Sequence, residues 1–256
     1  MEPELSTRGL GAASPPEPES PRVARPVMFH TWRDMTFLHW RYPVAEVQAL
    51  LPDGLSVQPC DGSAWVGLLP FVMDDVRAPG VPALPWLSRF PETNVRTYVR
   101  GPDGGTGIWF FSLDAARLPV VAAARVGYGL PYVWSDMSVR RDGAGRVYRS
   151  RRHADRHVRC DVSVRFGPAL TQPEQATVDR FLTAQHRLYS VLGGRLIAAN
   201  AQHGQWPLRR ARVTDLDQNL LEAAGLSSPD GEPVVHASAG VRVRIGLWHT
   251  VRPRRA

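Results

Sequence analysis

Lysine is missing from this 256-residue chain, in which all 31 basic residues are arginine. A guanidinium group stays protonated in proteins and is not a nucleophile, so arginine cannot replace an amine that attacks a carbonyl carbon. The sequence therefore excludes Schiff-base catalysis by a side chain. This absence removes a whole class of covalent chemistry from the enzymes that the chain could be.

Cysteine and long apolar runs are also scarce. Cys60 and Cys160 are the only two cysteines, too few for a disulfide framework in a chain of this length. No apolar run approaches the roughly 20 residues that span a bilayer, and the first residues lack the basic-then-apolar pattern of a signal peptide. These absences predict a cytoplasmic protein that makes no membrane contact.

Basic charge is in excess, with a formal net charge of +7. Nine arginines between residues 140 and 165 could bind an acidic partner, but the solvated outer face of a sheet explains them at least as well. Arginine as the sole basic residue, beside abundant Ala, Gly, Pro and Val, is typical of a GC-rich genome. We expect a small organic molecule rather than nucleic acid as the partner. The sequence does not decide whether the chain forms a homo-oligomer.

Three segments are predicted along the chain: a disordered Pro/Glu-rich tail at 1–26, a single domain at 27–250 and a basic tail at 251–256. Within the domain, short apolar periods bounded by Pro, Gly and Asp indicate a mainly β protein with a few helices, of the α+β class. A hairpin is expected at Asp142–Gly145. The expected strands are 35–42, 64–73, 94–100, 107–113, 133–141, 147–151, 158–166, 194–199 and 241–250.

Helices are expected at four places, each with a recognisable start or stop. Proline at a first turn predicts helices at 44–51 and at 120–126, the second closed by Gly127. A capping box at Thr171 and Glu174 predicts the longest helix, which we expect to run to Leu192. A short helix is expected near 216–224, ending at Gly225.

Several motifs in a fixed order resemble a family of unknown function, the YqjF-like family DUF2071, which belongs with the acetoacetate decarboxylase-like proteins. They are WRDMTFLHW at 32–40, LLPDGL at 50–55, DGSAWVG at 61–67, PETNVRTYV at 91–99, GIWFFSLD at 107–114, LPY at 130–132 and HGQWPL at 203–208. The resemblance implies an antiparallel β-barrel or double sheet, closed or nearly closed, around an internal pocket. It also implies a catalytic lysine near residues 125–132, where this chain has no amine.

The most informative stretch for function begins at Glu92. A strand's period of two places Glu92, Asn94, Arg96 and Tyr98 on one face. That face is either a solvated surface or, because the neighbouring strand at 108–111 is apolar on both faces, an enclosed polar wall. If it is enclosed, Glu92 could act as an acid or base, Arg96 could hold a ligand carboxylate and Asn94 could orient the ligand.

Two histidines and several aromatic residues complete the candidate site. His39 and His203 are candidates for acid–base chemistry or ligand contact, although a buried histidine that holds a backbone carbonyl is the commoner case. The resemblance places Tyr128 and Tyr132 at the same end of the pocket, and Trp206 near His203 is a further candidate ligand contact.

Metal ligands are not predicted. His153 and His157 would lie ~13 Å apart along a strand, and no second Cys/His pair follows them. We expect no cofactor either.

Two functions fit these residues. One is a lyase-, isomerase- or cyclase-like enzyme in which Glu92, Arg96 and His203 act on a carbonyl or carboxylate compound without covalent amine catalysis. The other is a non-catalytic barrel that binds a small ligand.

Overall fold

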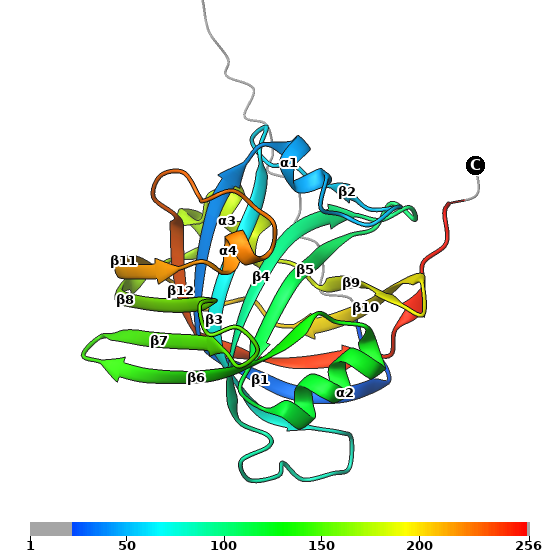
Figure 1. Cartoon of the computed structure of the whole chain (residues 1–256), viewed down its shortest axis with the longest axis horizontal. Helices are drawn as coiled ribbons and strands as arrows, with labels where there is room; N and C mark the ends of the chain where they lie inside the picture. The colour runs from blue at the N-terminus through cyan, green and yellow to red at the C-terminus, as the bar shows by residue number, and fades with distance from the viewer. Residues whose placement is uncertain (1–21, 255–256) are drawn as a thin grey trace, which may run out of the picture.

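The structure is a computed structural model that describes residues 22–254, and it is dominated by β-strands (Figure 1). No helix in this part of the chain is long and apolar enough to cross a membrane. In chain order the elements are β1 (Pro26–Tyr42), α1 (Val44–Gln48), β2 (Ser56–Val57), β3 (Ala64–Arg77), β4 (Phe90–Arg100), β5 (Thr106–Ala115), α2 (Leu118–Tyr128), β6 (Tyr132–Asp142), β7 (Gly145–Arg152), β8 (Arg159–Ala169), the 3-10 helix η1 (Gln172–Glu174), α3 (Thr177–Thr183), β9 (Arg187–Leu192), β10 (Arg195–His203), β11 (Leu208–Gln218), α4 (Leu220–Ala223), β12 (Val234–Gly246) and β13 (His249–Thr250).

The strands form a double sheet. Their order is β13-β10-β9-β5-β6-β7-β8-β11-β12-β1-β3-β4-β2, and further pairings join β10 to β12 and β4 to β5. Most pairs are antiparallel, but β5 runs parallel to both β6 and β9. The expected α+β fold of a few helices on a large sheet is confirmed.

The sequence also allowed a closed barrel, but the described residues form a double sheet. The pairings that fold the sheet over differ in length: β4 and β5 share nine residue pairs, but β10 and β12 share three. By contrast, β1 pairs along most of its length with β12 on one side and β3 on the other. Such uneven pairing folds two layers together without the regular stagger that a closed barrel requires.

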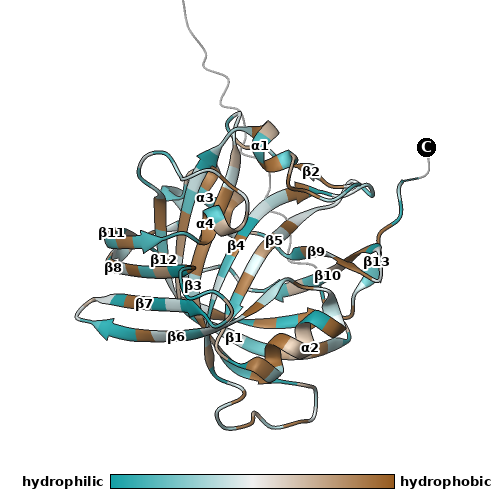
Figure 2. Cartoon of the chain, viewed as in Figure 1, coloured by the Kyte–Doolittle hydropathy of each residue, from teal (hydrophilic) through white to brown (hydrophobic). Residues whose placement is uncertain are grey.

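Residues 64–73 of β3 are an almost unbroken apolar run, as the hydropathy colouring of the ribbon indicates (Figure 2), because apolar side chains pack on both faces of this strand. Val66 and Leu68 of β3 pack in one core with Tyr148 and Val162. Leu69 and Phe71 alternate with these residues along β3 and point to the opposite face of the strand, where they pack in a second core with Phe37. The second core surrounds the candidate site.

The hairpin prediction at residues 142–145 is confirmed. Asp142 pairs with Gly145, and Gly143 has a φ of +53°, a conformation that glycine adopts without strain. The prolines at positions 43 and 119 also mark the starts of α1 and α2 as predicted. Gly127 does not close α2, which continues to Tyr128 and ends at the left-handed Gly129.

The long helix predicted from Thr171 to Leu192 is wrong. The capping box forms, with the carboxylate of Glu174 accepting from the Thr171 backbone N–H at 2.8 Å, but only η1 and the short α3 follow it. Residues 187–192 form β9, which pairs with β10 and β5. Leu188 lines a cavity while Tyr189 is buried in a different core, so both faces of β9 are covered and its apolar spacing did not distinguish strand from helix.

The helix predicted at 216–224 is also shorter than expected. β11 continues to Gln218 and α4 occupies only Leu220–Ala223. Of the predicted N-terminal tail, residues 1–21 lie outside the described part of the chain. Val23 is buried and donates its backbone N–H to the side-chain oxygen of Gln202 at 3.0 Å. At the other end, Val251 is buried and bonded to the Leu196 carbonyl, and residues 255–256 are not described.

Candidate functional site

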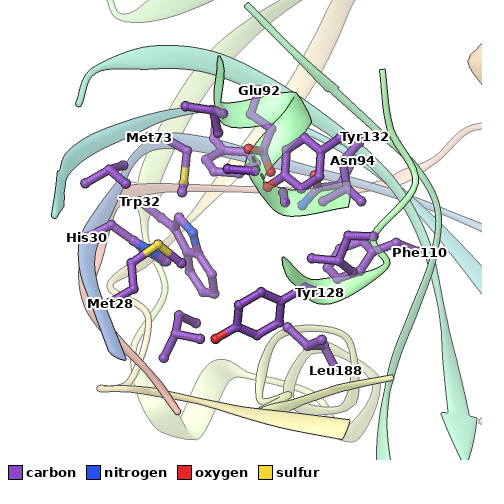
Figure 3. Close-up of a pocket in the computed structure, with 18 residues that line it drawn as sticks. Met28, His30, Trp32, Met73, Glu92, Asn94, Phe110, Tyr128, Tyr132 and Leu188 are labelled. Atoms are coloured by element: carbon purple, nitrogen blue, oxygen red, sulfur yellow. Dashed lines mark hydrogen bonds between the residues drawn. The ribbon is translucent and has the colours of Figure 1, made fainter. Parts of the chain in front are cut away.

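A cavity of about 280 Å³ lies between the inner face of the sheet and helix α2 (Figure 3). β1, β3, β4 and β5 form its wall, and α2 and the start of β6 cover it. Its volume is at the small end of ligand pockets, which occupy about 300–1,000 Å³. The lining is mostly apolar: Met28, His30, Trp32, Phe71, Met73, Val76, Glu92, Asn94, Phe110, Leu113, Val120, Ala123, Ala124, Tyr128, Leu130, Tyr132, Leu188 and Ile245.

Glu92 is the acidic residue of this wall. It lies on β4 between Phe71 of β3 and Ala115 of β5, and only 3% of its surface is exposed. Tyr132, at the start of β6, donates its hydroxyl to a carboxyl oxygen of Glu92 at 3.0 Å.

The pKa of Glu92 is raised to about 8. Burial is the main cause, because it removes water from the charged form; the hydrogen bond from Tyr132 opposes the shift and the nearby Asp114 carboxylate adds to it. Glu92 is therefore a neutral carboxylic acid at pH 7, able to donate its proton into the cavity.

Two further polar side chains face the cavity with unused hydrogen-bonding atoms. The buried side-chain oxygen of Asn94, and both ring nitrogens of His30, lack a hydrogen-bond partner among residues 22–254. Burial lowers the pKa of His30 to about 3, so its imidazole is neutral. Buried polar atoms normally have partners, and atoms without one are candidates to bind a ligand.

His30 was missed at the sequence level because the first strand was expected to begin at Met35. β1 begins at Pro26, and its alternation places Met28, His30 and Trp32 on the cavity side. This period-two pattern of large side chains was the signal that could have found it.

Arg96 and Tyr98 lie on the same buried face of β4 as Glu92, but helix α3 covers them. Arg96 donates to the carbonyl of Leu182 at 3.1 Å, and the hydroxyl of Tyr98 donates to the same oxygen at 2.7 Å. His39 Nε2 is 2.7 Å from the Tyr98 hydroxyl, and burial lowers the pKa of His39 well below its usual value. These three residues form a network that anchors α3 and do not line the cavity.

His203 and Trp206 lie behind the cavity wall. His203 contacts the carbonyls of Gly204 at 2.7 Å and Gln185 at 3.2 Å, and burial lowers its pKa. Trp206 stacks on Trp32 with 5.7 Å between the ring centroids. Both therefore support Trp32, which is itself part of the lining.

Tyr128 and Tyr132 both reach the cavity (Figure 3). Tyr128 donates its hydroxyl to the carbonyl of Gly246 at 3.2 Å, which ties α2 to β12. Arg125 donates to the backbone carbonyl of Tyr132 at 2.6 Å and does not line the cavity. Within residues 22–254 no arginine lines this space, so it offers no fixed positive charge to an anionic ligand.

The described residues contain no group of three or more His, Cys, Asp or Glu side chains placed to hold a metal ion. His153 stacks instead on Trp134, with 3.7 Å between the ring centroids.

This architecture defines the class of protein: the double sheet is similar to that of acetoacetate decarboxylase-like enzymes. Acetoacetate decarboxylase from Legionella pneumophila subsp. pneumophila str. Philadelphia 1 matches with a TM-score of 0.66 at 12% identity, over 93% of each chain. The enduracididine biosynthesis enzyme MppR, complexed with pyruvate, matches with a TM-score of 0.65 at 16% identity, over 91% of this chain and 93% of that one. At these identities the likeness is one of fold.

The family follows from the sequence comparisons. The model of DUF2071, described as an uncharacterized conserved protein, matches residues 30–242. The uncharacterized protein YqjF of Bacillus subtilis (strain 168) is 34% identical over 210 residues, which cover 82% of this chain and 86% of YqjF. The chain belongs to the DUF2071 family, as its motifs indicated.

Proposed function

We propose that the cavity binds a small, largely apolar carbonyl compound and acts on it by acid–base chemistry, without a covalent amine intermediate. The observation that carries this proposal is a buried carboxyl group, Glu92, held by Tyr132 in the wall of an apolar cavity, where burial raises its pKa to about 8. Such an acid can donate to a carbonyl oxygen and stabilise the charge that develops when the compound becomes enol-like. The reaction would be of the isomerase or lyase type.

The cavity's charge favours a neutral carbonyl compound over a carboxylate. A ligand carboxylate would need a cation, and Arg96 donates to the carbonyl of Leu182 beneath α3. A ligand carboxylate would also face the side-chain oxygen of Asn94, which is a hydrogen-bond acceptor and cannot donate to it. A neutral carbonyl oxygen, by contrast, can accept from Glu92 without any counter-charge.

A non-catalytic ligand-binding protein is the second candidate, favoured by the apolar lining alone. We expect either protein to act in the cytoplasm, because Cys60 and Cys160 are both free.

Exchange of ketone hydrogens in D2O distinguishes the two functions. Proton NMR measures the deuteration of 2-pentanone at the carbon next to its carbonyl group. We expect the protein to accelerate this exchange, and Glu92→Gln to slow it about 100-fold or more. Glu232→Gln, which changes an exposed carboxyl group far from the cavity lining, is the matched control and should exchange at the wild-type rate.

Saturation-transfer NMR on the same samples measures ketone binding. Binding without acceleration would support the ligand-binding protein and reject the enzyme. Equal exchange rates in the wild type and Glu92→Gln would remove Glu92 from the chemistry.

A further inference from the structure

His30 is a buried histidine whose ring lies beside that of Trp32, with 5.4 Å between the ring centroids. It is 4% exposed, and neither ring nitrogen has a hydrogen-bond partner among residues 22–254. His203, which is buried to a similar degree, has a structural role, since backbone carbonyls lie 2.7 and 3.2 Å from its two ring nitrogens and a ring N–H can donate to one of them. An imidazole that loses its water without gaining a partner destabilises the fold, so its retention in a cavity wall points to a ligand.

The surroundings of His30 are uncharged on the cavity side. Its neighbours in the lining include Met28 and Trp32 on β1, Met73 and Val76 on β3 and Ile245 on β12. Asp75, Arg77 and Arg244 line a second pocket that His30 also borders, and none of the three lines this cavity.

Phe29, next to His30 in the chain, pairs with Arg77 of β3 and Arg244 of β12. Its ring lies under the Arg77 guanidinium at 5.1 Å, which places this charged layer outside the cavity. Burial alone then lowers the pKa of His30 to about 3, and its imidazole keeps a free lone pair at neutral pH.

His30 and Glu92 lie on different strands and face one cavity (Figure 3). Their environments push them toward complementary states at neutral pH, a proton donor in Glu92 and a proton acceptor in His30. A pair of titratable groups separated in this way is the usual arrangement of an acid and a base in one site.

We propose that His30 is the catalytic base of this cavity and that the substrate is a small neutral ketone or aldehyde with a hydrogen on the carbon next to its carbonyl group. The inference rests on the proposed function and adds the second residue and the substrate class. In the step, a lone pair on a His30 nitrogen takes the hydrogen from carbon and that C–H bond breaks. Its electron pair forms the C=C bond of an enol, while the carbonyl oxygen takes the proton of Glu92.

The step leaves an imidazolium, a carboxylate and an enol, with no oxidant or reductant involved. When the proton of His30 returns to the same carbon and Glu92 recovers its own from the enol oxygen, the ketone is restored. Where the substrate also carries a C=C bond one carbon beyond, the product of the first step is a dienol, and returning the proton to its far carbon moves the C=C bond into conjugation and completes an isomerisation. Solvent exchange of the imidazolium proton before its return labels the substrate with deuterium in D2O. The cavity's small volume restricts the reaction to compact substrates.

The test compares His30→Gln and His30→Leu with the wild type in the exchange assay with 2-pentanone and with cyclohexanone. We expect both variants to lose about 100-fold or more in exchange rate while saturation-transfer NMR still detects bound ketone. His153→Ala, which removes an exposed histidine outside the cavity, should exchange as the wild type does. Circular dichroism and thermal unfolding verify that each variant is folded.

The pH profile of the wild type supplies a readout that needs no variant. Exchange should stay level from pH 5 to pH 7, because His30 remains unprotonated, and should fall above pH 8 as Glu92 loses its proton.

Loss of exchange in Glu92→Gln with wild-type exchange in both His30 variants would overturn the role of His30 and leave the proposed function standing. Wild-type exchange in the variants of both residues would overturn both. A wild-type protein that binds the ketones and accelerates no exchange would also overturn the inference, as would an acid limb in the profile near pH 6.5.

Discussion

Replacing Glu92 with glutamine should stabilise the protein, by an amount that grows as the pH rises. In the folded chain the pKa of Glu92 is raised from 4.5 to about 8, so the folded state binds this proton more tightly than the unfolded state does. The stability that proton binding by Glu92 contributes to the folded state is therefore fully present below pH 4.5, and it is lost as the pH rises through about 8. Glutamine stays neutral at every pH, and its side-chain oxygen can still accept from Tyr132.

The size of the effect follows from the two pKa values. Linkage between proton binding and folding gives a destabilisation by Glu92, relative to a permanently neutral group, of about 1 kcal/mol at pH 5, about 3 kcal/mol at pH 7 and about 5 kcal/mol at pH 9. The exposed fraction of Glu92 is only 3%, so solvent screening reduces these values little. Against a total stability of about 5–15 kcal/mol for a folded domain, the difference at pH 9 is large.

Urea unfolding at pH 5, 7 and 9, followed by tryptophan fluorescence, measures the effect. The free energy of unfolding of Glu92→Gln minus that of the wild type should rise by about 4 kcal/mol between pH 5 and pH 9. Other groups that titrate in this range are common to both proteins and cancel in the difference. A difference that stays constant with pH would show that Glu92 is ionised in the folded state, and the reasoning on its acid role would fail.

Two further substitutions test how the cavity's cover and its neighbouring strands are held. Gly129→Ala should destabilise the protein by at least about 1–3 kcal/mol in thermal or urea unfolding, because Gly129 has a φ of +60° and a new Cβ would collide with the Val191 carbonyl. Arg152→Ala should cost about 3–5 kcal/mol in urea unfolding, because it leaves the fully buried carboxylate of Asp114 without the guanidinium that lies 2.9 Å away.

Each of these has a matched control elsewhere in the chain. Gly127→Ala, inside α2 with no atom within 4 Å of the added Cβ, should instead stabilise by about 0.5–1 kcal/mol. Arg151→Ala breaks a partly exposed pair with Asp161 and should cost about 0–1 kcal/mol. Similar effects for the two glycines, or for the two arginines, would contradict the geometry described for these sites.

Local chemistry in the sequence was enough to predict several features. The lack of lysine excludes imine chemistry by a side chain whatever the fold. The hairpin at Asp142–Gly145 and the starts of α1 and α2 depend on the backbone preferences of glycine and proline, which act within a few residues. The shared face of Glu92 and Asn94 on β4 follows from the period of a strand.

Only the tertiary structure decided which members of that face meet a cavity. The period of the strand placed Glu92 and Arg96 on the same face and made both candidates for the site. Helix α3, which comes from a distant part of the chain, covers Arg96 with the carbonyl of Leu182. Packing from afar also made residues 187–192 a strand, because the ladders with β10 and β5 outweigh an apolar spacing that suits a helix.

The sequence by itself thus determined the chemistry that is impossible and the faces on which polar side chains stand, since both depend on residue identity and local geometry. The tertiary structure decided that His30 joins Glu92 at one cavity and that both are uncharged there, since burial, the cause of both pKa shifts, is set by every element packed around them.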